Sequence, residues 1–233
     1  MKRTSFLAFC ALVAAFCITV QEKLHAQEEQ SIWLGAFGGV DRGKLSYSAD
    51  VPNQSSIPES EWKSRAYFGI ESDIWFTEHW AIMMRPTYAE KGTYEYSELT
   101  TTINGEEKNV NATQDMTLTY FQLPAGVRAM FGGGQFKTSF FFATTVDFLL
   151  SAENHITYEG YSDTTVTMTD VGEMEIGLVA GTSIGYMFES GISVFAEAVY
   201  DYGIGNIYRD KANAPSASTR DSRFGLSMFF QIK

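Results

Sequence analysis

Cysteine is nearly absent from this sequence, and both copies, Cys10 and Cys17, lie within the first 26 residues. From Gln27 onward the chain therefore has no disulfide framework, thiol nucleophile or thiolate metal site. That part of the chain also lacks any run of about 18 apolar residues, which excludes a transmembrane helix. A membrane-spanning barrel is not excluded, because its strands need only about ten residues of alternating hydrophobicity.

The first 26 residues have the pattern of a secretory signal peptide. Lys2 and Arg3 form a positive start, residues 6–20 are a continuous apolar run, and Ala26 is the small residue that a signal peptidase requires. We therefore predict two parts, a cleaved signal peptide at 1–26 and a single domain at 27–233.

Basic residues are also in short supply. The sequence has 17 Lys and Arg against 28 Asp and Glu, a formal net charge of −11. Three of the basic residues and one acidic residue belong to the first 26 positions, so the remainder has 14 against 27. A chain this acidic is not expected to bind nucleic acid.

The rest of the sequence is rich in aromatic and β-branched residues that alternate with polar ones, as in half-exposed strands. Short turns at 77–79, 132–135 and 189–191 alternate with long polar loops, which we place at 49–63, 98–114, 153–170 and 209–220. The sequence therefore predicts an all-β fold, an eight-stranded antiparallel up-and-down transmembrane β-barrel. The expected strands are 31–48, 64–76, 80–97, 115–131, 136–152, 171–188, 192–208 and 221–232.

The two faces of each strand decide where the barrel sits. In residues 66–76 the even positions carry Phe68 and Ile70, and the odd positions carry Glu71 and Asp73. The polar face of the strands has small residues and charges of both signs, few of them lysines, whereas the apolar face is too bulky to fill an eight-stranded interior. Aromatic residues recur near the strand ends, as in the girdles of membrane barrels. We therefore expect the apolar face to meet lipid.

The charged residues of the polar face should then lie in the lumen, where an unpaired charge costs several kcal/mol. Arg85 is the expected partner of Glu71 and Asp73, and the cluster is expected to stabilise the barrel. Pro124 cannot donate a ladder hydrogen bond, so a bulge or kink is expected there. The predicted lumen cluster comprises Glu71, Asp73, Arg85, Arg128, Asp147, Glu175 and Glu197.

Residues 75–94 and 116–131 resemble the PorT-type outer-membrane β-barrel family of Bacteroidetes. The likeness lies in a Tyr-x-x-Lys-Gly element, Tyr88 to Gly92, and a Tyr-x-x-x-Pro strand, Tyr120 to Pro124. OmpX-like and OmpA-like barrels share the eight-stranded plan. The resemblance implies the outer membrane of a Gram-negative cell envelope, insertion by the barrel-assembly machinery and, for some members, a role in a secretion system. The chain ends in Lys233, not in the usual aromatic residue.

Residues suited to chemistry are few. His79 and His155 fall at opposite ends of the predicted barrel, so they cannot share a metal or a catalytic site. The acids Glu159 and Asp163, with Asp170, favour a solvated loop over a calcium site.

We therefore expect no catalytic residue, metal or cofactor. Thr164 is a candidate for O-glycosylation, because Asp163-Thr164-Thr165 resembles the Asp-Ser/Thr-x pattern of Bacteroidetes. The expected function is a non-enzymatic, structural or interaction barrel acting through four extracellular loops. The alternatives are an accessory component of a secretion or envelope machine and a lipid-modifying enzyme.

Overall fold

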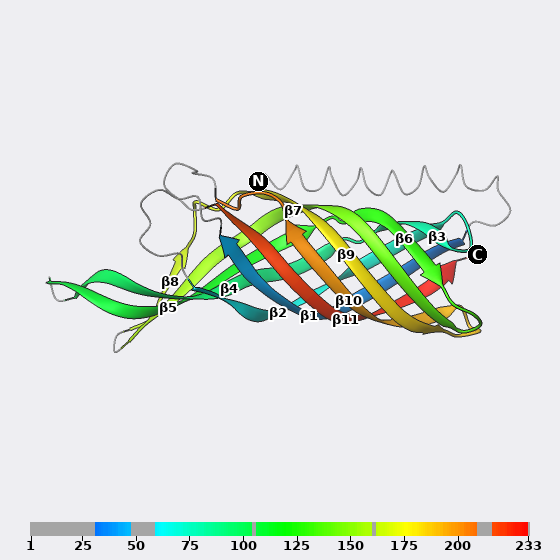
Figure 1. Ribbon diagram of the computed structural model, residues 1–233, viewed down its shortest axis with the longest axis horizontal. Helices are drawn as coiled ribbons and strands as arrows, with labels where there is room; N and C mark the ends of the chain where they lie inside the picture. Colours follow the sequence, from blue (N-terminus) through cyan, green and yellow to red (C-terminus); the bar gives the residue numbers. More distant parts are fainter. Residues whose placement is uncertain (1–30, 48–58, 104–105, 160–161, 209–215, 233) are drawn as a thin grey trace.

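The computed structural model describes residues 31–47, 59–103, 106–159, 162–208 and 216–232. The predicted signal peptide lies outside the described residues. The described residues contain no helix long and apolar enough to cross a membrane. They form one antiparallel sheet, shown in Figure 1. Its strands are β1 (Ser31–Tyr47), β2 (Glu59–Trp75), β3 (Trp80–Met84), β4 (Thr87–Ile103), β5 (Glu106–Gln122), β6 (Ala125–Phe131), β7 (Phe136–Tyr158), β8 (Thr164–Thr167), β9 (Met174–Met187), β10 (Ile192–Gly203) and β11 (Ala217–Ile232).

The sheet closes on itself because β1 pairs with both β2 and β11. β3 and β4 both pair with β2 and act as one interrupted strand, and β5 and β6 both pair with β7 in the same way. β8 pairs only with the far end of β7. Over the described residues the wall therefore has eight strands, as the sequence predicts, and closure removes the free edges of the barrel wall.

Two prolines cause the interruptions. β5 gives way to β6 at Leu123–Pro124, which is the local irregularity expected from the sequence. The sequence does not predict the second break, at Arg85–Pro86. The two breaks lie side by side, and the Arg85 N–H donates to the Pro124 carbonyl at 2.9 Å. The Pro86 carbonyl still accepts from the Ile70 N–H at 3.1 Å. Each proline thus loses a donor but keeps its acceptor in the ladder.

The three short connections match the sequence, and glycine makes two of them possible. Gly132 has a φ of 124°, Gly134 of 61° and Gly191 of 82°, a region that other residues avoid. The start of β1 lies opposite the end of β11 and beside the β2–β3 turn, since Ile32 pairs with both Ile232 and Ile74. Both ends of the described barrel therefore lie at the short-turn end.

The long connections differ from the prediction. The segment 98–114, expected to be a loop, continues the ladder of β4 and β5 as far as Ile103 and Glu106. β7 runs on to Tyr158, and β8 folds back beside it. Figure 1 shows these strands extending beyond the rest of the barrel. Polar composition does not distinguish a loop from a strand here, because strands that extend beyond the lipid-facing stretch need no apolar alternation.

The orientation of the two faces is confirmed by side-chain exposure. On β2, Ile70 is 64% exposed, whereas Glu71 and Asp73 are 2% and 0% exposed. The same alternation runs through strand β1, where Val40 is exposed and Asp41 is buried. An apolar surface continuous around a barrel is what a lipid environment selects. Its exposed members include Leu34, Val40, Phe68, Ile70, Ile82, Val127, Phe140, Phe142, Leu150, Ile176, Ile184, Phe224, Leu226, Met228 and Phe230.

Candidate functional site

The candidate site is the interior of the barrel together with its two ends. All seven residues of the predicted lumen cluster are buried, with 0–4% of their surface exposed. The structure divides them between two ionic layers, because Glu71, Asp73, Arg85, Arg128 and Glu197 lie toward the short turns and Asp147 and Glu175 lie toward the long hairpins. We call these the lower and the upper ionic layer.

The lower ionic layer is a chain of alternating charges. Arg85 lies 3.4 Å from Glu71, as the sequence predicts, and it also donates to Glu197. Asp73, however, pairs with Arg128, at 3.5 Å, and Arg128 also binds Glu71. The five residues come from strands far apart in sequence and tie opposite walls of the barrel together.

The upper ionic layer centres on Lys91. Its ammonium group lies 3.0 Å from Asp147, 3.0 Å from Asp201 and 3.3 Å from Asp221. Beside it Arg223 binds Asp201 at 2.9 Å. Arg223 also binds Asp41 at 2.8 Å, and Glu175 accepts a hydrogen bond from Thr219 at 3.1 Å.

Sequence reasoning missed most of this upper layer, including its central cation. The sequence marks Lys91 only as part of a family motif, and the predicted strand 221–232 has Asp221 as its first residue. The signal was nonetheless present, because Lys91 has the same strand parity as Arg85, and both point inward. Extending the parity test past the apolar stretch of each strand finds these residues.

The two layers differ in their balance of charge. The lower layer has two cations for three acids, whereas the upper layer has two cations, Lys91 and Arg223, for five acids. Within the upper layer, Asp221 accepts no hydrogen bond on either carboxylate oxygen and relies on its 3.3 Å ion pair with Lys91. Mutual repulsion among five acids that share two cations opposes folding, so this layer depends on Lys91 and Arg223.

Apolar layers close the lumen on both sides of the charges. Toward the short turns, Trp33, Trp75 and Phe229 pack together, with Trp33 and Trp75 ring centroids 5.2 Å apart. Between the ionic layers, the rings of Phe37 and Phe141 lie against the guanidinium of Arg85. Aromatic rings therefore fill the lumen together with the small residues and charges that the sequence indicates. Glycines on neighbouring strands make room for these rings.

The end with the long hairpins is sealed by a cap of buried apolar residues. Val171 and Tyr208 form a bridge from two different connections, and Leu45, Leu118 and Tyr120 pack beneath it. At the edge of the cap Tyr47 donates a hydrogen bond to Glu95. Burial raises the pKa of the Glu95 carboxyl, and this hydrogen bond acts in the opposite direction.

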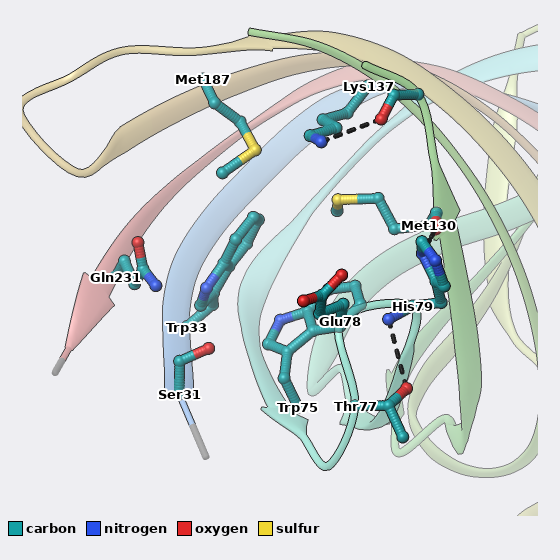
Figure 2. A pocket seen from close by; sticks show the side chains of 11 residues that line it. Ser31, Trp33, Trp75, Thr77, Glu78, His79, Met130, Lys137, Met187 and Gln231 are labelled. Carbon is teal, nitrogen blue, oxygen red and sulfur yellow. Dashed lines mark hydrogen bonds between the residues drawn. The ribbon is translucent and has the colours of Figure 1, made fainter. Parts of the chain in front are cut away.

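At the short-turn end the barrel has an open cavity of about 460 Å³. Figure 2 shows Trp33 and Trp75 side by side in its wall, with Met130 and Met187 also pointing into it. The polar groups there serve the turns, because Lys137 Nζ donates to the Gly132 carbonyl at 3.0 Å. Trp33 and Trp75 form the inner wall of this cavity and separate it from the lower ionic layer.

The two histidines lie at opposite ends of the barrel, as predicted. His79 belongs to the β2–β3 turn, where its Nδ1 lies 3.1 Å from the Met130 carbonyl. His155, on the extension of β7, lies 2.9 Å from Thr165 Oγ1 and 3.6 Å from Asp163. Among the residues that the structure describes, no serine hydroxyl contacts either ring, so these residues form no Ser-His-acid arrangement.

The acidic connection also holds no metal centre in the described residues. The described part of the chain contains no group of three or more His, Cys, Asp or Glu side chains that could hold a metal ion. Glu159 instead accepts a hydrogen bond from Asn111 at 3.0 Å. Thr164 lies on β8 and is exposed.

A closed antiparallel barrel with an apolar outer surface and a charged, sealed interior defines a transmembrane β-barrel. The chain belongs to the outer membrane protein beta-barrel domain family, whose model matches residues 25–209. It is thus an outer-membrane β-barrel protein.

Several solved structures are similar to this chain. Neisserial surface protein A shares 14% identity, covering 87% of this chain and 99% of its own, with a TM-score of 0.47. Ail of Yersinia pestis, solved with a heparin analogue, shares 10% identity over 88% and 100% of the two chains, with a TM-score of 0.41. OprG of Pseudomonas aeruginosa shares 10% over 86% and 95%, with a TM-score of 0.41. A search of the curated proteins finds no significant match.

Proposed function

We propose that this protein is a non-enzymatic outer-membrane barrel whose working surface is the ribbon formed by the extensions of β4, β5 and β7. One observation carries the proposal: β4 and β5 pair over their full length, from Thr87–Gln122 to Ile103–Glu106. The lipid-facing apolar stretch of these strands ends near Tyr88 and Phe121. Most of the ribbon therefore stands outside the membrane as ordered structure.

In the proposed orientation the long hairpins face outside the cell, and the short turns and both termini face the periplasm. The protein would reach this position by export on its signal peptide and insertion by the barrel-assembly machinery. The sealed lumen supports an interaction role over a conducting one, because buried side chains fill the interior from the tryptophans of the short-turn end to the apolar cap. A barrel with a filled lumen is a rigid support for the external ribbon.

The ribbon has the features of a recognition surface. Asn111 is exposed and bonded to Glu159, the residue after β7, and Ala112 pairs with Tyr158, so the extension is a sheet and not a lone hairpin. β8 adds a fourth strand whose side chains are all exposed. A partner can therefore bind the flat face of the sheet or add a strand at its edge.

The test is a shortened barrel in which residues 96–113 are replaced by Asn-Gly, which favours a two-residue hairpin turn. Because the removed pairs lie outside the lipid-facing stretch, the shortened protein should still fold, as judged by its heat-sensitive electrophoretic mobility. Surface crosslinking of whole cells should then lose the partners that the full-length protein captures. Unchanged crosslinks would contradict the proposal.

An accessory role in a secretion or envelope machine is the finer alternative. It rests on the Tyr88 to Gly92 and Tyr120 to Pro124 elements. In this barrel Lys91 holds the upper ionic layer and Tyr120 packs in the cap, so both elements have structural roles. Pull-down from solubilised outer membranes would favour the accessory role if stable envelope partners remain bound to the shortened barrel.

A further inference from the structure

A group of outward-facing cations lies just beyond the apolar surface on β1 and β11. On β1 the last apolar outward residue is Val40, and the next two outward positions are Arg42 and Lys44. On β11 the last apolar outward residue is Phe224, and Arg220 lies directly opposite Lys44 in the ladder. The lipid-facing stretch thus ends in three basic side chains on two neighbouring strands.

These three cations differ from every cation of the lumen, because none of them has a salt-bridge partner among the described residues. Aromatic rings hold two of them in place. Lys44 Nζ lies 5.0 Å from the centroid of Trp62, and the Arg220 guanidinium lies 4.7 Å from that of Tyr202. Stacking on a ring leaves the N–H groups of a guanidinium available to an anion.

A shallow cavity of about 210 Å³ lies beside Arg220. Ser46 and Ser218 line it together with Tyr47 and Tyr202, so its wall offers hydroxyl groups and aromatic surface. Arg220 Nε is buried there with no hydrogen-bond partner. A buried donor without an acceptor costs free energy, and a bound oxygen would satisfy it.

We propose that Arg42, Lys44 and Arg220 bind the phosphate group of a glycolipid in the surrounding leaflet of the outer membrane. The acyl chains of that lipid would lie on Val40 and Phe224, the phosphate on the three cations, and the sugar against the serine and tyrosine cavity. Arginine suits this role because its fork of donors matches phosphate oxygens. The identity of the lipid rests on the proposed orientation, in which this end of the barrel faces outward.

A lipid is favoured over a soluble anion by the charge of the whole chain. With a formal net charge of −11, the protein repels free anions, and the patch is small. A lipid that already contacts the apolar surface is held at high local concentration, so three cations suffice. Basic residues at a membrane surface each strengthen binding to anionic lipid by about five-fold.

The experiment uses the full barrel in neutral detergent micelles and measures retained lipid by native mass spectrometry. The probes are bisphosphorylated lipid A and the same lipid with its phosphates removed. The wild-type barrel should retain the phosphorylated form and release the dephosphorylated one. R42Q/K44Q/R220Q should bind the phosphorylated lipid about 100-fold more weakly, whereas the charge-preserving R42K/K44R/R220K should stay within a few-fold of wild type.

Lys137→Gln is the matched control, because it removes a cation at the opposite end of the barrel. Equal retention by the triple glutamine variant, or an equal loss in Lys137→Gln, would overturn the proposal. Displacement of the lipid by millimolar inorganic phosphate would also overturn it, by showing a site for free anions. The ribbon is intact in all these variants, so the result is independent of the shortened-barrel test.

Discussion

The two ionic layers of the lumen both bury acids together with cations, but they differ in the ratio of acids to cations. In the lower layer three acids face two arginines, and aromatic rings lie against both guanidinium groups, with Arg85 3.8 Å from the centroid of Phe37. In the upper layer five acids share one lysine and one arginine, and an apolar cap covers them. The comparison teaches that burying charges together does not require balance, provided that each cation reaches several acids.

The largest expected effect comes from removing the cation on which most acids depend. Lys91→Met should destabilise the barrel by about 3–5 kcal/mol, because it leaves Arg223 alone among five acids. Arg128→Met, in the lower layer, should cost less because Arg85 still neutralises its neighbours. Both are measured by guanidinium unfolding in lipid vesicles.

If Arg128→Met proved the more harmful of the two, the contrast between the layers would be reversed. Lys137→Met is the control for losing an amine, and we expect it to change stability by less than about 0.5 kcal/mol.

The surplus acid in the upper layer gives a second comparison, between two aspartates paired in one ladder. Asp201 accepts hydrogen bonds from Arg223 and Gln122, each at 2.9 Å, and Asp221 accepts none. Asp201→Asn should therefore cost about 2–3 kcal/mol, and Asp221→Asn less than about 1 kcal/mol, because it also removes repulsion. Equal losses in the same unfolding assay would show that the charge surplus has no energetic meaning.

Adding one methyl group tests whether the rings of Phe37 and Phe141, between the two ionic layers, are tightly packed. A Cβ at position 181 would lie 2.3 Å from Cζ of Phe141, a ring that contacts both lower-layer arginines. Gly181→Ala should cost about 1–3 kcal/mol, because the ring must move. Gly133→Ala is the control, since no atom lies within 4 Å of its added Cβ. A Gly181→Ala barrel as stable as that control would show that the ring is not confined.

The smallest effect is expected outside both layers. His155 lies on the exposed extension of β7, so His155→Ala should change the unfolding free energy by less than about 0.5 kcal/mol. Partner crosslinking and envelope integrity should also be unaltered. A lipid-hydrolysing activity that is present in the wild type and lost in this variant would instead support the enzymatic alternative.

The sequence predicts the barrel well because strand parity records which face meets lipid. Ile70 beside Glu71 is enough to place two side chains, and repetition over eight strands gives the architecture. Tertiary contacts cannot be read this way, so Asp73 was assigned to Arg85 when it binds Arg128. Lys91 and Asp221 were missed because they lie where the apolar alternation stops, and a lumen continues beyond that point.

The external ribbon shows a different limit. The segment 98–114 is polar on both faces, which is typical of loops and equally of a ladder in water. Only pairing with its neighbours distinguishes the two, and pairing is not a property of one segment. The lipid-facing orientation is easier to predict, because strand parity separates the two faces locally and the bulk of the apolar face excludes it from an eight-stranded interior.

That orientation is tested most directly by lipid-borne quenching along β11. Residues 27–233 contain no cysteine, so single cysteines can be placed at Leu226, which is 62% exposed, and at Ser227, which is 2% exposed. In vesicles, a fluorophore on Leu226→Cys should be strongly quenched by nitroxide-labelled acyl chains, and Ser227→Cys should not react with the fluorophore at all. An unquenched Leu226→Cys label beside a reactive Ser227→Cys would mean that the barrel is inverted and that its apolar face does not meet lipid.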